Sequence, residues 1–195
     1  MNTQSRRQAY AEATRQALLG AARQLFAERG YAQTSIDDIA RSEQLTKGAF
    51  YHHFKHKQDI FEQVVDDLLA SAAALVAQAA GAAAEPWERA LAALDAFLDG
   101  CLDPVYQRIV IQEAPAVLGW SAWRERERRS GLALAAALLG ELMELGLIER
   151  QPLELAAQLL LGAIMEAALA IAHAPNPAGT RAEARGLLER MIRAL

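Results

Sequence analysis

Cysteine, β-branched residues and long apolar runs are scarce in this chain of 195 residues. Its one cysteine, Cys101, cannot form a disulfide within the chain, which excludes a disulfide-stapled secreted scaffold. Residues 1–16 are polar and lack the apolar core of a signal peptide. The longest uncharged stretch, Leu68 to Ala84, is mostly alanine and falls short of the roughly 20 strongly apolar residues of a membrane-spanning helix. We therefore expect a cytoplasmic protein that does not enter a membrane.

The net charge is small, −4, from 20 basic and 24 acidic residues. Taken as a whole, this charge argues against a general nucleic-acid binder. The sum nevertheless combines two regions of opposite sign, because residues 1–60 carry a net charge of +3 and the remaining residues −7. All three lysines lie between Lys47 and Lys57. A basic surface is therefore expected only near the N-terminus.

Alanine and leucine dominate the apolar residues, and their helical spacing predicts an all-α protein. In the first predicted helix, Leu18, Ala22 and Phe26 belong to one apolar stripe that ends before Gly30. Nine helices are expected, at about residues 13–29, 34–42, 47–54, 57–84, 86–102, 104–113, 120–145, 152–174 and 181–195. The predicted division lies between residues 1–55 and residues 56–195, without a flexible linker.

Two short predicted helices, residues 34–42 and 47–54, are joined by a tight turn, which indicates a helix-turn-helix. The second helix is slim at Gly48 and Ala49, so its backbone can approach a DNA groove. Phe50 and Phe54, four residues apart, are expected to face inward. Four side chains of this helix can then reach phosphates and base edges: Lys47, Tyr51, His52 and His53.

The segment T-S-I-D-D-I-A-x-x-E-x-L-T-K-G-A-F-Y-H-H-F-K-x-K, from Thr34 to Lys57, resembles the DNA-binding region of the TetR family of bacterial transcriptional repressors. LLGAARQLFAERGY, from Leu18 to Tyr31, is similar to the first helix of that family. The resemblance implies an N-terminal helix-turn-helix domain and a helical C-terminal domain that dimerises and binds a small inducer. It also implies a palindromic double-stranded DNA operator that the homodimer binds and the inducer releases.

Carried over by position, the resemblance implies DNA contacts from the start of the second helix, from the third helix and from the start of the fourth. These residues are Thr34, Ser35, Thr46, Lys47, Gly48, Ala49, Tyr51, His52, His53 and Lys57. Tyr51 and Lys57 are expected at phosphates, whereas Lys47, Ala49 and His52 are the candidates for contacts with bases.

Two positions depart from the family pattern. Gln44 occupies the turn position where the family usually has glycine, and a left-handed conformation there costs about 1–2 kcal/mol. His56 stands where serine or asparagine commonly caps the fourth helix, and histidine is a poorer cap.

Three of the four histidines, His52, His53 and His56, lie close together in the sequence. No cysteine accompanies them, so DNA contact or a packed surface is favoured over a metal site. Cys101, on a helix of alanine and leucine, is expected to be an inert apolar residue rather than a redox sensor. No metal and no cofactor are predicted.

A small-molecule cavity is expected in the C-terminal region, where alanine, leucine and tryptophan predict a mainly apolar ligand. Tryptophans there either pack in the core or line the cavity, and polar residues within apolar runs have a partner, orient a ligand or face water. The candidate cavity residues are Trp87, Cys101, Gln112, Glu113, Trp120, Trp123 and Glu166. The charged run 124–129 is expected to form a solvated face with pairs such as Glu125/Arg129, the alternative being an arginine that binds an anionic ligand.

The last two helices are the predicted dimer interface, because their apolar residues share a face and their small residues permit close approach. The candidates are Leu155, Leu159, Gly162, Ala163, Ala167, Ile171, Leu188, Met191 and Ile192. In the TetR family two such helices from each subunit form a four-helix bundle; the alternative is packing within one subunit only.

No Ser/His/Asp order, glycine-rich phosphate loop or metal-ligand spacing is visible, so no enzymatic activity is expected. A helical adaptor that binds no DNA is the other alternative, and the segment Lys47 to Tyr51, on an otherwise acidic chain, argues against it. We expect a homodimeric transcriptional regulator, with ligand-released repression favoured over activation.

Overall fold

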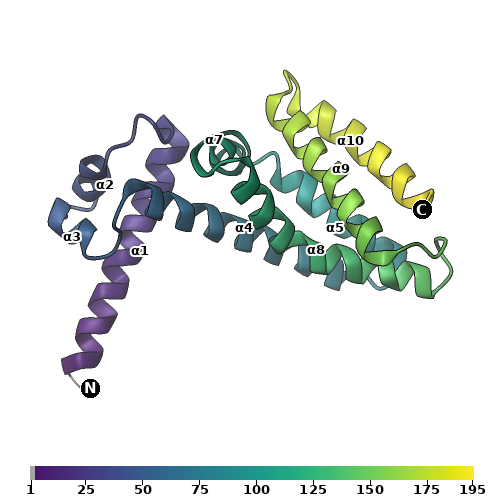
Figure 1. Ribbon diagram of the computed structural model, residues 1–195, viewed down its shortest axis with the longest axis horizontal. Helices are drawn as coiled ribbons and strands as arrows, with labels where there is room; N and C mark the ends of the chain where they lie inside the picture. Colours follow the sequence, from purple (N-terminus) through teal and green to yellow (C-terminus); the bar gives the residue numbers. More distant parts are fainter. Residues whose placement is uncertain (1–2) are drawn as a thin grey trace. The chain divides into compact units, whose positions relative to one another are not determined.

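The computed structural model describes residues 3–195, with side chains from residue 6 onward, and every regular element in this range is a helix. In chain order they are α1 (Thr3–Arg29), α2 (Ile36–Ser42), α3 (Lys47–Tyr51), α4 (Lys57–Ala82), α5 (Pro86–Gly100), α6 (Pro104–Tyr106), the π-helix η1 (Gln107–Glu113), α7 (Ala114–Leu118), α8 (Trp120–Glu144), α9 (Leu153–His173) and α10 (Pro177–Arg193) (Figure 1). Since α6, η1 and α7 follow one another without a break, the described residues form nine helices. The all-α prediction is confirmed.

The chain forms two compact units, which divide within α4 between Asp67 and Leu68. The division expected from the sequence lies just before this helix. Helix α4 therefore contributes its first turns to one unit and the rest of its length to the other.

The first unit is built around aromatic rings. The ring of Phe26 on α1 lies edge-on to that of Phe61 on α4, with centroids 5.2 Å apart, and Tyr31 packs against both rings. Helix α2 packs on α1 and α3 packs on α2, which buries Ile39 and Phe50 completely. Burial of large aromatic side chains is a main source of stability in a unit of this size.

Three predicted helix boundaries are wrong. Helix α1 begins at Thr3 rather than near residue 13, because glutamine, arginine, alanine and glutamate favour helix even without an apolar stripe. Helix α3 ends at Tyr51 rather than at residue 54, and His52 is its C-cap. Helix α10 begins at Pro177 rather than near residue 181, since proline suits the first helical position and Asn176 caps the helix by accepting from the Gly179 N–H.

The helical run after Pro104 is interrupted later than expected. The sequence predicted a break over residues 114–119, but the helix continues to Leu118 and breaks only at Gly119, whose φ is 83°. Pro115 lacks the N–H of a regular helix, and just before it the chain widens into η1, where the Ala114 N–H donates to the Ile109 carbonyl oxygen.

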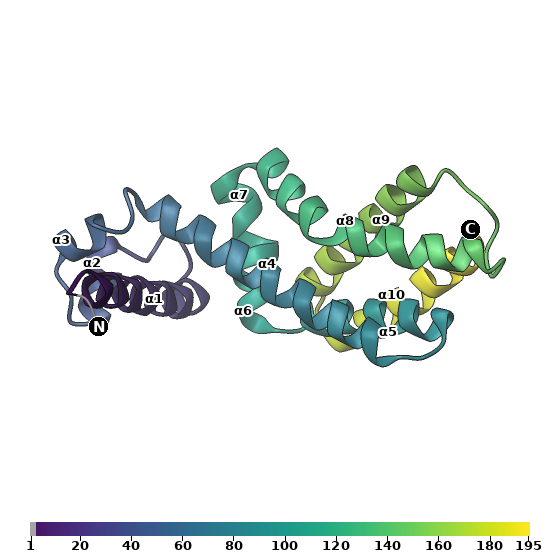
Figure 2. The same cartoon turned by 90° about the horizontal axis from the view of Figure 1, so that it is seen from below.

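In the second unit, four helices form a ring in which α5 contacts α8, α8 contacts α9, α9 contacts α10, and α10 returns to α5. Figures 1 and 2 show α9 running between α8 and α10. Helices α8 and α9 approach closely at Gly131, where an added Cβ would lie 3.0 Å from Leu161 Cδ1.

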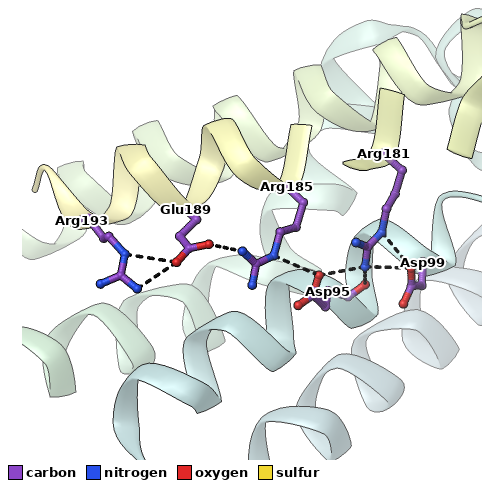
Figure 3. Close-up of polar contacts among 6 residues, drawn as sticks. All are labelled: Asp95, Asp99, Arg181, Arg185, Glu189 and Arg193. Atoms are coloured by element: carbon purple, nitrogen blue, oxygen red, sulfur yellow. Dashed lines mark hydrogen bonds and ion pairs between the residues drawn. The ribbon is translucent and has the colours of Figure 1, made fainter. Parts of the chain in front are cut away.

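A chain of ion pairs fixes α10 on α5 (Figure 3). Arg181 contacts the carboxylates of Asp95 and Asp99, each at 2.8 Å, and only 19% of its side chain is exposed. Arg185 also contacts Asp95 and pairs with Glu189. At the far end, the guanidinium of Arg193 lies 4.2 Å from the centre of the Trp87 ring. These contacts set the register of α10 along α5.

Helix α9 is long and apolar enough to cross a membrane by length and composition alone. It includes charged residues and therefore lies outside the longest uncharged stretch, residues 68–84, from which no membrane span was predicted. Core helices of water-soluble proteins pass the same test. Within the unit α9 packs on α8 and α10, and 44% of its most apolar window is buried.

Replacing Arg181 by alanine is expected to lower the free energy of unfolding of the second unit by about 1–2 kcal/mol, because the part-buried Asp95 and the Asp95 backbone lose charge-assisted hydrogen bonds. Urea denaturation followed by tryptophan fluorescence reports this unit, since all three tryptophans lie in it. Arg150→Ala, at an exposed arginine between α8 and α9, is the control and should stay within about 0.5 kcal/mol of the wild type. Equal effects of the two substitutions would contradict the role of the ion pairs.

Candidate functional site

The helix-turn-helix is held in shape by caps at both helix starts. The Ser35 hydroxyl accepts from the Asp38 N–H, and the Asp38 carboxylate accepts from the Ser35 N–H. Hydrogen bonds to this carboxylate, first from the Ser35 hydroxyl and then from the Ser35 N–H, lower the pKa of Asp38. At the next helix the Thr46 hydroxyl accepts from the Ala49 N–H. The two caps complete the hydrogen bonding of α2 and α3 at the ends where phosphates are expected.

The turn between α2 and α3 contains the left-handed residue that the sequence marked as a departure. Gln44 has a φ of 57°, and it is the only non-glycine residue with positive φ in residues 3–195. The backbone N–H of the next residue, Leu45, still has a partner: it donates to the Ala40 carbonyl oxygen at 2.8 Å. The strain of Gln44 is therefore carried by the hydrogen bonds and packing of the turn.

Helix α3 has a buried face and a polar outer face, as predicted. Phe50 and Phe54 are buried, and their ring centroids are 5.6 Å apart. On the outer face, half of the Tyr51 side chain is exposed, and the Lys47 ammonium group lies 3.2 Å from the Asp37 carboxylate. The remaining predicted contacts of this region are exposed or half-buried: Ser35, Thr46, Gly48, Ala49, His52 and His53.

Two predicted DNA contacts have internal partners instead of a free side chain. Thr34 is buried, and its hydroxyl donates toward the carbonyl oxygens of Gly30 and Leu25 at the end of α1. The ammonium group of Lys57 donates to the carbonyl oxygens of Tyr31 and Thr34, at 2.7 and 2.9 Å, and lies 4.2 Å from the centre of the Tyr31 ring. Both residues thus hold the approach to α2 in place.

The start of α4 has a cap that the sequence analysis did not find. The carboxylate of Asp59 accepts from the backbone N–H groups of Lys55 and His56, at 2.9 and 3.2 Å. Asp59 is the third residue of α4, so its carboxylate pairs with backbone N–H groups just before the helix and its charge favours the helix start, although His56 itself remains a poor cap. Within residues 6–195 no group of three or more His, Cys, Asp or Glu side chains is arranged to hold a metal ion.

The second unit encloses a cavity of about 320 Å³, a volume in the range of small-molecule sites. Its walls come from residues 69–77 of α4, 90–97 of α5, 127–139 of α8 and 160–165 of α9, together with Tyr106 and Ile192. The lining is almost wholly alanine, leucine and other apolar residues. The size and lining of the cavity therefore suit an apolar ligand of moderate size.

Glu127 is the one carboxylate in the cavity wall. Only 5% of the residue is exposed, and its Oε1 has no hydrogen-bond partner. Burial raises the pKa of Glu127 to about 7, although the positive charge of Arg124 acts in the opposite direction. The expectation of a wholly solvated charged face over residues 124–129 is wrong at this position.

The rest of that charged run behaves as predicted. Glu125 is exposed to a large extent and pairs with Arg128 at 2.9 Å and with Arg129 at 3.4 Å. Glu127 could have been found from spacing, because it lies four residues after Trp123 and four before Gly131, on the face of α8 that turns inward.

None of the seven residues proposed to line a cavity is in the wall of this one. Trp123 and Cys101 are buried beside it, and burial together with the charge of Glu127 raises the pKa of the Cys101 thiol to about 12. The Cys101 thiol therefore stays protonated near neutral pH and is a poor nucleophile. The others lie outside it: Trp87 is stacked under Arg193, Gln112 donates to the Ala172 carbonyl oxygen, Glu113 pairs with Arg108, and Trp120 and Glu166 are exposed.

The residues proposed for a dimer interface differ in exposure and fall into three groups. Leu155, Leu159 and Met191 are exposed, with Leu159 67% accessible. Gly162, Ala163 and Ala167 are half-buried beside them. Ile171, Leu188 and Ile192 are buried within their own chain, because they lie on the faces where α9 and α10 pack in the ring.

Comparison with known proteins shows two family matches along the chain. Residues 18–64 match the family described as "Bacterial regulatory proteins, tetR family", and residues 87–195 match "Tetracyclin repressor-like, C-terminal domain". A crystal structure of a TetR-family transcriptional regulator from Pectobacterium atrosepticum is 34% identical, with a TM-score of 0.85 over 95% of each chain.

Two curated proteins are similar to different lengths of the chain. The Transposon Tn10 TetC protein of Escherichia coli is 28% identical over 90% of this chain and 87% of its own length. The HTH-type transcriptional repressor BepR of Brucella suis is 45% identical over 31% of this chain and 29% of its own length.

Gln44→Gly is expected to raise the free energy of unfolding by up to about 1 kcal/mol, because glycine adopts the observed φ without steric cost. Gln44→Ala retains the strain and is the matched control. Urea denaturation followed by circular dichroism measures both. A glycine variant no more stable than the alanine variant would show that the turn stores no strain.

Proposed function

We propose that this chain, which belongs to the TetR family of DNA-binding transcriptional regulators, is a homodimeric repressor that binds a palindromic operator and is released by a small, mainly apolar ligand. The observation that carries the DNA-binding part is the exposed polar face of α3 over its buried phenylalanines. A slim helix with such a face fits the major groove of DNA.

The proposed DNA-contacting residues are of two kinds: side chains that are exposed, and side chains that hydrogen-bond within the chain. Tyr51, His52 and Lys47 are exposed and take the direct contacts, with Tyr51 at a phosphate and the other two at base edges. When DNA binds, Lys47 exchanges its ion pair with Asp37 for the DNA. Lys57 and Thr34 act by holding the turn before α2, so that the backbone there is presented to phosphates.

The dimer proposal is supported by an exposed apolar face on α9. Leu155, Leu159 and Gly162 follow one another at helical spacing, and Leu187 and Met191 expose a similar face on α10. Contiguous exposed apolar surface of this kind marks interaction sites. A two-fold dimer would place two recognition helices in grooves about 34–36 Å apart, one turn of DNA, or a multiple of it.

The release proposal depends on α4, which continues from the helix-turn-helix unit into the cavity wall. Lys57, the first residue of α4, donates a hydrogen bond to the Tyr31 carbonyl oxygen in the segment before α2. Further along the same helix, Leu69 and Val76 line the cavity. A ligand that fits the cavity better in one conformation of α4 than in another would shift the population of DNA-binding states. No catalytic role is proposed, and the site of action is the bacterial cytoplasm.

Lys47→Ala and Tyr51→Ala are each expected to weaken operator binding by about tenfold or more, since each removes a direct DNA contact. Footprinting on the DNA upstream of the gene that encodes the chain measures this. Lys47→Ala should also lower the preference for operator over unrelated DNA, because a contact with a base edge carries the sequence specificity. Arg150→Ala, which removes an exposed charge in the second unit, should bind as the wild type does. An unprotected upstream region, or normal binding by both variants, would refute the proposal.

Leu159→Glu is expected to convert the dimer to a monomer, because it places a charge in the middle of the exposed apolar face of α9. Light scattering coupled to size-exclusion chromatography measures the mass. Leu145→Glu alters a leucine of similar exposure at the end of α8 and should leave the dimer intact. A wild-type monomer, or a dimer that persists in Leu159→Glu, would contradict the interface.

A further inference from the structure

The apolar cavity contains one acidic side chain with an oxygen that none of the described residues 6–195 satisfies by a hydrogen bond. Glu127 lies in the wall, is 95% buried, and has an oxygen, Oε1, without a hydrogen-bond partner. A buried carboxylate without partners is costly, and native structures rarely leave one unsatisfied unless a ligand or a function requires it.

The charged and titratable groups around Glu127 are few. Arg124 lies one turn earlier on α8, and its charge favours the ionised carboxylate without a contact to it. Tyr106 on α6 and the buried thiol of Cys101, at the end of α5, are the titratable neighbours from other elements. The lining residues of α4, α5, α9 and α10 are all uncharged. The cavity thus holds one acid and no base.

The other polar side chains of the wall do not satisfy the carboxylate. Ser130 is directed to the backbone of α4, where its hydroxyl lies 3.4 Å from the Leu69 carbonyl oxygen. Phe97 and Tyr106 add aromatic surface, which attracts organic cations.

We propose that the cavity binds an apolar organic cation, whose protonated amine donates an N–H to the Glu127 carboxylate while its apolar body fills the space between α4, α5, α8 and α9. The proposal rests on the proposed function, in which this cavity is the ligand site. A cation supplies both the missing hydrogen bond and the missing positive charge, and such charge-assisted bonds are stronger than neutral ones. A neutral donor such as an alcohol supplies only the bond, and a carboxylic acid would bring a second negative charge.

Three probes of matched shape test the class of ligand: 4-phenylbutylamine, 4-phenylbutan-1-ol and 4-phenylbutyric acid. Isothermal titration calorimetry with the full chain at pH 8 should show the amine binding at least tenfold more tightly than the alcohol, and the acid binding most weakly. In Glu127→Gln the preference for the amine over the alcohol should disappear, while the alcohol keeps its affinity. Glu125→Gln, which removes an exposed carboxylate on the same helix, should retain the preference.

The pH dependence provides a readout that does not rely on a variant. Because the pKa of Glu127 is about 7 and the amine stays protonated to well above pH 8, amine affinity should rise about tenfold from pH 6 to pH 8, whereas alcohol affinity should not rise. In Glu127→Gln the rise should be absent.

An amine that does not bind, that binds no better than the alcohol, or whose preference survives in Glu127→Gln overturns the cation site. Should the alcohol bind equally well and still release DNA, the cation site fails and the proposed function stands. Should the amine be preferred through Glu127 while the footprint is absent, the cation site is supported and the proposed function fails.

Discussion

The first unit depends on one partly buried contact, the ammonium group of Lys57 between the carbonyl oxygens of Tyr31 and Thr34. It joins the first residue of α4 to the segment that connects α1 with α2. The ring of Tyr31 lies under the same ammonium group and packs on Phe61, so the charge is held by aromatic surface as well as by oxygen atoms. The position of α2, and with it that of α3, is therefore tied to α4.

Helix α4 belongs to both units. Its later residues Leu69 and Val76 line the apolar cavity, and Ile192 of α10, the helix that ion pairs join to α5, is another lining residue. The cavity combines an apolar lining with a single unsatisfied carboxylate, that of Glu127. Packing alone would favour an apolar residue at this position, and this buried carboxylate is the observation on which the ligand proposal rests.

The sequence was sufficient to predict the all-α fold, the inward Phe50 and Phe54 and the outward side chains of α3, because helical periodicity and the spacing of the motif determine them. Gln44 was marked only by the resemblance, as the position where the TetR family usually has glycine. It did not reveal that Thr34 and Lys57 have internal partners, since a hydroxyl or an ammonium group near a helix start suits both a phosphate and a carbonyl oxygen. The cavity wall could not be predicted from tryptophan and isolated polar residues, because it consists mostly of small and aliphatic side chains that are equally common in a packed core. Glu127 belongs to a run of alternating charges, which is typical of a solvated helix face. Only its spacing of four residues from both Trp123 and Gly131 indicates that it lies on the buried face of α8.

The central claim is that occupation of the cavity and binding of DNA are coupled through one chain. The most direct measurement is the operator affinity with and without a saturating cavity ligand, taken from the three phenylbutyl probes, together with the ligand affinity with and without operator. Coupling requires both affinities to fall by the same factor, typically about 5- to 150-fold. Operator affinity that is unchanged by a ligand bound in the cavity would contradict the account.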